Sequence, residues 1–289
     1  MRYCVKPKRR RSPVFPNFVF QQRGDAAIWM DRAYVEQGFI DRLIDADCLF
    51  AEPDCQIIKD QRKIKVGRLT LPMVGRSRTF FVKRYNVSSL RHRLASPFVR
   101  SGAFRSLCGA AILRAAHIPI ARPLAAVENR RGGALIKSFF LSEEIVGGET
   151  VDAFWRGRLL GVKGRKGVAL RRRFLADLAN LFKTLHSERI YHNDLKDANI
   201  LAAADRCESD LRLYLLDLDG VARLARLSER RKVKNLVQIN RTLGRYLRQP
   251  EKVYFLEHYL GAGFAQRSVR RRLSQSVIKE SRRMDLLKG

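Results

Sequence analysis

Three polar side chains in the second half of the chain have the types and spacing needed to transfer a phosphoryl group. Asp194 and Asn199 lie in the stretch YHNDLKDANIL at 191–201, and Asp217 lies 18 positions after Asn199 in the stretch LLDLDG. A carboxylate can accept the proton of an attacking hydroxyl. An amide oxygen and a second carboxylate are hard ligands suited to Mg²⁺. Phosphoryl transfer depends mainly on positioning and charge neutralisation, so this set predicts it.

Composition limits the classes of protein to consider. The chain has 289 residues, 46% of them hydrophobic, which is enough for one large domain or two lobes around a cleft. Its formal charge of +30 predicts an anionic partner, which could be nucleic acid, an acidic membrane surface or a phosphorylated substrate. The five cysteines show no C-x-x-C spacing, which disfavours a zinc site or a disulfide framework and favours a reducing cytosol. The longest apolar stretch, 110–127, contains Arg and His and is not expected to span a membrane.

The first half of the chain is predicted to form a basic arm followed by a small β-rich lobe. Residues 1–25 would be the arm, with a basic cluster at Lys6–Arg11, and residues 26–142 the lobe. Apolar–polar alternation predicts strands within 56–85, and helical periodicity predicts two helices. The expected elements are a helix at 31–46, β structure at 56–85, a helix at 103–116, and strands at 124–127 and 134–141.

The second half is predicted to be mainly helical. Residues 143–150, which contain two adjacent glycines, would form a hinge, and residues 151–289 a larger lobe. Apolar residues at helical spacing predict a buried helix that ends near His186 and leads into the loop containing Asp194. Further helices are expected at 234–247 and 252–260, with Gln249-Pro250-Glu251 as a loop before the second of these.

Three further motifs carry a family resemblance. The strand FVKRY at 81–85, the passage HIPIARPL at 117–124 and the junction of Leu185-His186 with His192-Asn193-Asp194 resemble those of the bacterial lipopolysaccharide core kinases of the Kdo/WaaP type. The resemblance covers roughly residues 55–260. It implies an α+β, two-lobed protein-kinase-like fold, with a nucleotide-binding N-lobe and a C-lobe that carries the catalytic residues and binds the acceptor.

The resemblance also implies a role for each polar residue of the catalytic loop. Asp194 would be the catalytic base, and Asn199 and Asp217 would hold Mg²⁺ against the phosphates of ATP. Lys196 would neutralise the γ-phosphate during transfer, or would be a solvated loop lysine. Asp219 stands where the protein-kinase motif has glycine, and both a ligand contact and a turn role are open for it.

For the nucleotide, the resemblance implies that Lys83 contacts the α- and β-phosphates and that Glu144, in the hinge, contributes to nucleotide binding.

The chain also departs from the protein-kinase pattern. No G-x-G-x-x-G precedes Lys83, so the turn near 59–63 would cover the phosphates. The helix expected at 103–116 contains no Glu to pair with Lys83. Asn193 replaces the Arg that senses a phosphorylated activation loop, and His192 is expected to brace the two motifs by hydrogen bonding.

The leading functional hypothesis is ATP- and Mg²⁺-dependent phosphorylation of a sugar hydroxyl, on heptose or Kdo, in the lipopolysaccharide inner core. The basic runs 156–166 and 171–173 would line the acceptor surface. The protein is expected to be cytoplasmic and peripheral on the anionic inner face of the inner membrane. The alternatives are a kinase of another small molecule or of protein, and a non-catalytic pseudokinase that binds an anionic partner, which the missing Glu favours. Nucleic acid is the partner with least support.

Overall fold

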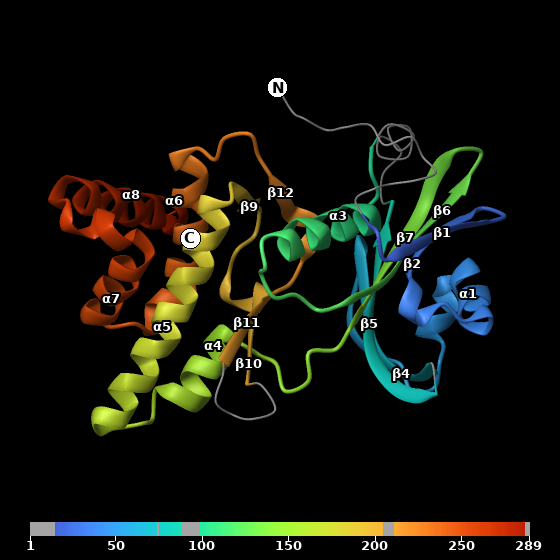
Figure 1. Cartoon of the computed structure of the whole chain (residues 1–289), viewed down its shortest axis with the longest axis horizontal. Helices are drawn as coiled ribbons and strands as arrows, with labels where there is room; N and C mark the ends of the chain where they lie inside the picture. The colour runs from blue at the N-terminus through green and yellow to red at the C-terminus, as the bar shows by residue number, and fades with distance from the viewer. Residues whose placement is uncertain (1–14, 74, 88–98, 205–210, 287–289) are drawn as a thin grey trace. The chain divides into compact units, whose positions relative to one another are not determined.

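The computed structural model describes residues 15–73, 75–87, 99–204 and 211–286, which form two compact units (Figure 1). The sheet unit comprises the described residues up to Ala111 together with Ala121–Ile145. The helical unit comprises Ile112–Ile120 and the described residues from Val146 onward. This division into a β-rich unit and a helical unit agrees with the predicted α+β class. Within the described part of the chain, no helix has the length and apolar character that crossing a membrane requires.

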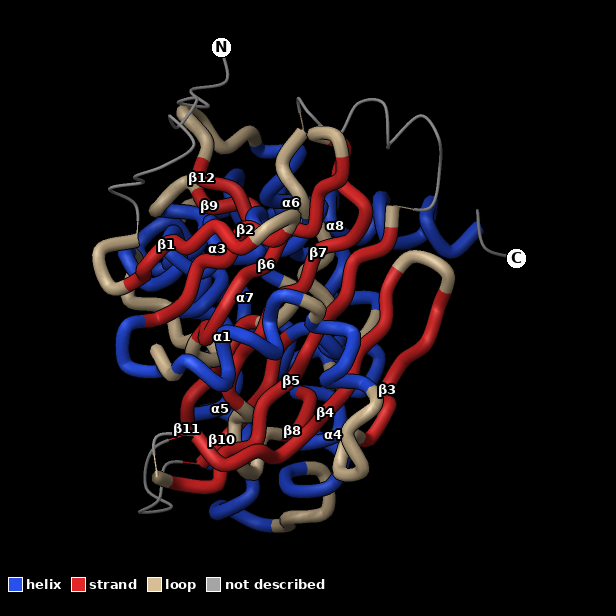
Figure 2. The backbone as a smooth tube through the Cα atoms, turned by 90° about the vertical axis from the view of Figure 1, so that its right-hand side faces the viewer, coloured by secondary structure: helices blue, strands red, loops and turns tan. Residues whose placement is uncertain are grey.

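The sheet unit is built on seven antiparallel strands in the order β1-β2-β6-β7-β5-β4-β3 (Figure 2). Alternate side chains of a strand face opposite sides of a sheet, so Phe80 and Val82 of β5 are fully buried on one face while Lys83 belongs to the other. The strands are β1 (Phe18–Arg23), β2 (Ala26–Asp31), β3 (Gln56–Gln61), β4 (Ile64–Met73), β5 (Arg76–Asn86), β6 (Pro123–Arg131) and β7 (Ala134–Glu143).

The two faces of the sheet are covered by different helices. α1 (Gln37–Ile44) lies across one face, where its apolar residues join the main core of the unit (Figure 2). α3 (Gly102–Ala115) approaches the other face through Gly102, where an added Cβ would come within 2.4 Å of the Tyr85 ring. Glycine is therefore required for this close contact. α3 passes from the sheet unit into the helical unit, as the division between the units falls after Ala111.

The helical unit is organised around one long helix, α5. Phe174, Leu178, Phe182 and Leu185 of α5 are buried at helical spacing, as the sequence predicts. The helices are α4 (Val151–Phe154), a π-turn η3 (Trp155–Leu159), α5 (Gly164–Ser187), α6 (Glu229–Arg241), the 3₁₀ turn η6 (Leu243–Tyr246), α7 (Gln249–Leu260), the 3₁₀ turn η7 (Gly261–Ala265) and α8 (Arg267–Leu286). The short elements are β8 (Glu149–Thr150), β9 (Ile190–His192), η4 (Asp197–Asn199), β10 (Ile200–Ala204), β11 (Leu211–Leu215), η5 (Leu218–Gly220) and β12 (Val221–Arg223).

In the N-terminal half, two expected elements differ from the structure. The helix expected at 31–46 is broken, because Asp31 ends β2 and its carboxylate caps the 3₁₀ turn η1 (Arg32–Tyr34) by accepting the Ala33 N–H at 3.1 Å. β1 lies inside the range expected to be an arm, where it pairs with β2. The basic cluster at 6–11 lies outside the described residues.

In the helical unit, the expected helix at 234–247 begins earlier, at Glu229, and gives way to η6. The interpretation of Gln249-Pro250-Glu251 as a loop is wrong, because these residues form the first turn of α7. Proline is well tolerated in a first helical turn, where its missing N–H has no helical partner to lose.

Candidate active site

The two predicted motifs meet at one end of a β-hairpin in the helical unit. β10 pairs antiparallel with β11, with Ile200 opposite Leu215, and Leu216 N–H donates to the Asn199 carbonyl at 2.9 Å. Asn199 and Asp217 therefore lie beside each other at the same end of the hairpin. A second pairing, β9 with β12, brings the start of the catalytic loop to the residues that follow Asp217.

His192 joins the two motifs, as predicted. Its Nε2 donates to the Leu216 carbonyl at 2.9 Å, and its Nδ1 accepts the Asp194 N–H at 3.2 Å. Burial lowers the pKa of His192, and this effect outweighs the Leu216 hydrogen bond and the nearby charges of Asp217, Asp194 and Asp219. The imidazole is therefore neutral and carries its proton on Nε2. Its place beside three carboxylates makes it a structural brace between the loops that carry them.

Asp194 is oriented by two neighbours within its own loop. Lys196 Nζ lies 2.7 Å from Asp194 Oδ2, and Asn199 Nδ2 donates to the Asp194 carbonyl at 2.7 Å and to Oδ2 at 3.2 Å. The Asp194 side chain is 42% exposed, so an acceptor can reach its carboxylate. The nitrogen of the Asn199 amide is bound to Asp194, and among the described residues its oxygen accepts no hydrogen bond. That oxygen is the group of Asn199 that is suited to a cation.

Asp217 has a backbone conformation that few non-glycine residues adopt. Its φ of 57° and ψ of 50° are left-handed, a conformation that raises the energy of such a residue by about 1–2 kcal/mol. Residues kept in such conformations are concentrated at ligand sites. The donors around Asp217 fit Mg²⁺ in type, because a carboxylate and an amide oxygen are hard ligands. Within the described part of the chain, no three His, Cys, Asp or Glu gather as a metal site.

α6 holds the catalytic loop from behind through one side-chain amide. Gln238 Nε2 donates to the Asn193 carbonyl at 2.9 Å, and Gln238 Oε1 accepts the Leu195 N–H at 3.1 Å. Gln238 therefore bridges the backbone on both sides of Asp194. Two further polar residues share this helix face. Asn235 Nδ2 donates to the His192 carbonyl at 2.6 Å, while Thr242, just after the helix, accepts the Asp197 N–H at 3.4 Å.

A buried hydrogen-bond chain extends this brace to α5 and α7. Tyr259 O–H lies 2.7 Å from His186 Nδ1, and His186 Nε2 lies 3.4 Å from Asn235 Oδ1. Burial lowers the pKa of His186 to about 4. A neutral His186 accepts from Tyr259 and donates to Asn235, which leaves the Asn235 amide nitrogen to bind His192. The sequence does not identify Asn235, Gln238, Thr242 or Tyr259 as part of the site. The only sequence signal was polar residues at helical spacing on a helix with an apolar side.

The predicted nucleotide residues lie in the sheet unit. Lys83 Nζ is 4.8 Å from the centre of the Tyr85 ring, and the Tyr85 hydroxyl is 2.8 Å from Ser106 of α3. The sequence of α3 contains no carboxylate, so this contact between β5 and α3 uses an aromatic ring and two hydroxyls. Glu144 forms a two-pronged ion pair with Arg68 at 2.7 and 2.9 Å, which occupies its carboxylate. Its N–H donates to the Thr79 carbonyl at 3.0 Å.

These features define a kinase-like protein, and comparison with known proteins identifies its family. The structure resembles one described as WaaP in complex with acyl carrier protein, with a TM-score of 0.59 and 18% sequence identity over 85% of this chain and 97% of the other. The sequence profile of the lipopolysaccharide kinase (Kdo/WaaP) family matches residues 61–259. The chain therefore belongs to the lipopolysaccharide kinase (Kdo/WaaP) family and is a kinase. No protein of curated function matches its sequence.

Proposed function

We propose that this kinase transfers the γ-phosphate of ATP, with Mg²⁺, to a hydroxyl of heptose or Kdo in the lipopolysaccharide inner core. The observation that carries the proposal is the geometry of the catalytic loop. One accessible carboxylate, Asp194, contacts the Lys196 ammonium and the amide nitrogen of Asn199, and among the described residues the Asn199 oxygen accepts no hydrogen bond. The family supplies the substrate class, and the loop supplies the groups that transfer to an alcohol requires.

In the proposed reaction, Asp194 accepts the proton of the sugar hydroxyl. The sugar oxygen forms a bond to the γ-phosphorus while the bond from that phosphorus to the β–γ bridging oxygen breaks, which releases ADP. We propose that Lys196, whose Nζ lies 2.7 Å from Asp194 Oδ2, neutralises charge on the transferred group. Asn199 and Asp217 would hold Mg²⁺, which when bound supplies positive charge to the phosphate oxygens.

In the sheet unit, we propose that Lys83 contacts the α- and β-phosphates of ATP. Because Arg68 occupies the Glu144 carboxylate and Thr79 accepts its N–H, the backbone carbonyl is the part of Glu144 proposed to contact the nucleotide. The β3–β4 turn at Arg62-Lys63 is proposed to cover the phosphates in place of a glycine-rich loop. Its two backbone carbonyls accept hydrogen bonds from Asn86, which fixes the turn against the end of β5.

We further propose that the enzyme acts on the cytoplasmic face of the inner membrane, held there by charge. The support is the formal charge of +30 and the exposed basic residues at the start of α5. Each Lys or Arg near an acidic leaflet contributes about 1 kcal/mol, and this attraction is screened within about 8 Å in physiological salt. Sedimentation with acidic vesicles, but not with neutral ones, and release by high salt are expected. Equal binding to neutral vesicles would refute attachment by charge.

The test of the reaction is incubation of the purified protein with labelled ATP, Mg²⁺ and a series of truncated lipopolysaccharides. Mass spectrometry of each acceptor would locate the added phosphate. We expect one added phosphate on an inner-core sugar, dependent on Mg²⁺ and absent with the Asp194→Ala variant. Label transfer to none of the truncated lipopolysaccharides, with the nucleotide still bound, would refute the proposed substrate.

A further inference from the structure

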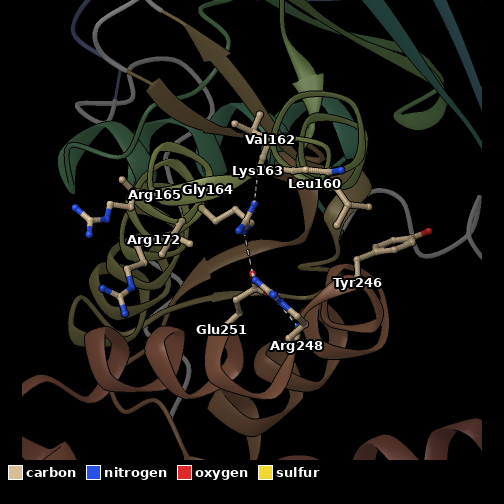
Figure 3. A pocket seen from close by; sticks show the side chains of 12 residues that line it. Leu160, Val162, Lys163, Gly164, Arg165, Arg172, Tyr246, Arg248 and Glu251 are labelled. Carbon is tan, nitrogen blue, oxygen red and sulfur yellow. Dashed lines mark hydrogen bonds and ion pairs between the residues drawn. The ribbon is translucent and has the colours of Figure 1, made fainter.

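The helical unit contains a cavity whose lining is both apolar and strongly basic. Its volume is about 890 Å³, and it lies between the end of η3, the first turns of α5 and α7, and η6 (Figure 3). Five cationic side chains and one carboxylate line it, together with several aliphatic side chains. The charged residues are Lys163, Arg165, Arg171, Arg172, Arg248 and Glu251. A neighbouring cavity of about 540 Å³ shares residues with it and continues between α5 and α7.

The wall of this cavity is fixed by buried contacts. The Arg171 guanidinium donates to the carbonyls of Leu159 and Val162 at 3.2 and 2.9 Å and pairs with Glu251 at 3.1 Å. Gly167 allows α5 to pack closely against Val162, because an added Cβ there would come within 1.9 Å of the Val162 oxygen. The cavity is therefore preformed, and Arg171 and Glu251 serve to build it.

Of the four other cations, only Arg248 has a counter-charge among the described residues, because it pairs at 3.0 Å with Glu251, the carboxylate that Arg171 also contacts. Within the described part of the chain, Lys163 and Arg165 form no ion pair or hydrogen bond through their side chains, and Arg172 lies over the ring of Tyr254 at 5.3 Å. α5 begins with Lys163 as its cap and carries no acidic residue in its first turn. Positive charge at a helix N-terminus opposes the helix dipole, so this arrangement is unfavourable without a bound anion. An anion in the cavity would relieve this repulsion.

The cavity is connected to the catalytic loop within the same unit. Tyr246, the last residue of η6, lines the cavity. η6 starts directly after Thr242, and the Thr242 hydroxyl accepts the Asp197 N–H of the catalytic loop. A four-residue 3₁₀ turn is roughly 8 Å long. Arg156 lies over the Tyr246 ring at 5.6 Å and pairs with Asp152 at 3.0 Å. A ligand in this cavity would thus lie near the loop that carries Asp194.

We propose that this cavity binds a phosphate group already present on the amphiphilic lipopolysaccharide acceptor. Lys163 and Arg165, which have no ion-pair partner among the described residues, would bind the phosphate, and Leu160 and Val168 would contact the apolar part next to it. The proposal rests on the proposed function for the identity of the acceptor. The cavity lining itself specifies the chemistry, which is a phosphate attached to an apolar group.

The test compares two double variants with the same change of charge. Lys163→Glu with Arg165→Glu alters the cavity, and Arg271→Glu with Arg272→Glu alters an exposed basic patch on α8 that does not line it. With the phosphorylated acceptor, the cavity variant is expected to raise the acceptor KM about tenfold or more, with kcat and the KM for ATP within about twofold of the wild type. The α8 variant should behave as wild type. Phosphatase treatment of the acceptor should raise the wild-type KM and remove the difference between the proteins.

Binding is also measured without turnover, by calorimetry with a soluble phosphorylated acceptor fragment, its dephosphorylated form and inorganic phosphate, and by sedimentation with anionic phospholipid vesicles. Selective loss of binding to the phosphorylated fragment in the cavity variant supports the proposal, even if no lipopolysaccharide is phosphorylated and the proposed function fails. Unchanged binding in the cavity variant would overturn it. So would inorganic phosphate binding as tightly as the fragment, which would indicate a free-phosphate site. A loss confined to phospholipid vesicles would assign the cavity to the membrane instead.

Discussion

The bridge from Gln238 to the catalytic loop leads to a sharp prediction about Asp194. Gln238→Glu keeps the shape of the side chain and can still accept the Leu195 N–H. However, it replaces the donor to the Asn193 carbonyl, at 2.9 Å, by an oxygen that repels it. Transfer should slow, because the loop on the N-terminal side of Asp194 moves away from α6. The KM for ATP should change little, because this contact does not involve the nucleotide.

The expected change in the free energy of unfolding follows from the lost hydrogen bond, and the expected change in kcat follows from the displaced loop. A neutral hydrogen bond contributes about 0.5–1.5 kcal/mol. The Asn193 carbonyl lies at an exposed position, so water can replace the lost donor and no penalty for a buried unpaired group is added. We therefore expect the free energy of unfolding to fall by about 0.5–1.5 kcal/mol. Misplacing a reacting group by about 1 Å can slow a reaction about 10²-fold, so kcat should fall about 10- to 100-fold.

The control uses the same chemical change on the same helix. Asn240 donates to the Ser281 hydroxyl at 3.0 Å, away from the catalytic loop, so Asn240→Asp should leave kcat near the wild-type value. A pH series separates positioning from damage to the fold. On protonation the new carboxyl regains a donor, so the kcat deficit of Gln238→Glu should shrink between about pH 8 and about pH 5. Wild-type kcat at pH 8, or a deficit independent of pH, would refute the reasoning.

The remaining predictions concern the catalytic base, the metal and the buried histidine. Asp194→Ala should reduce transfer about 10²–10⁴-fold while calorimetry shows unchanged ATP binding, and near-normal turnover would remove Asp194 from its assigned role. Asp217→Asn should weaken Mg²⁺-dependent ATP binding more than Asn199→Ala does, since a charged ligand is lost, and equal effects would contradict this ranking. The folded-state pKa of His186 is lowered from 6.5 to about 4, so its contribution to stability is complete above about pH 6.5 and declines as the pH falls to about 4. Denaturation of the wild type should show a loss of about 3 kcal/mol across that window, and His186→Gln should abolish that part of the slope.

The sequence predicted the parts of the site whose residues are close together in the chain. The catalytic loop runs from His192 to Asn199 without interruption, so its hydrogen bonds are local, and the pairing with the Asp217 strand follows from a single hairpin. Alternation along 64–71 likewise predicted β4, because one face of that strand packs on the core. Local patterning and tertiary structure agree at these positions.

What the sequence did not predict depends on contacts between distant residues. Gln238 contacts residues 43 and 45 positions away, and no local pattern distinguishes it from a solvated polar residue on an amphipathic helix. The sequence also does not predict the cavity, although four of its five basic residues lie in the runs 156–166 and 171–173 that are expected to line the acceptor surface. Its shape depends on Arg171 reaching back to Leu159 and Val162 and forward to Glu251. Such contacts exist only after α5 and α7 have packed.

The position of α6 bears on how the catalytic loop is kept in place. Only residues 221–228 separate η5 from α6, so the helix follows the Asp217 motif almost directly, and no long activation segment intervenes. Asn193 stands where a protein kinase has the Arg that reads a phosphorylated segment, and its side chain accepts from Lys234 of α6 at 3.1 Å. The loop is thus held by neutral amides and by one lysine, all on a helix of the same unit. Because none of these contacts needs a modified residue, they form when α6 packs against the loop, and folding itself sets the geometry around Asp194.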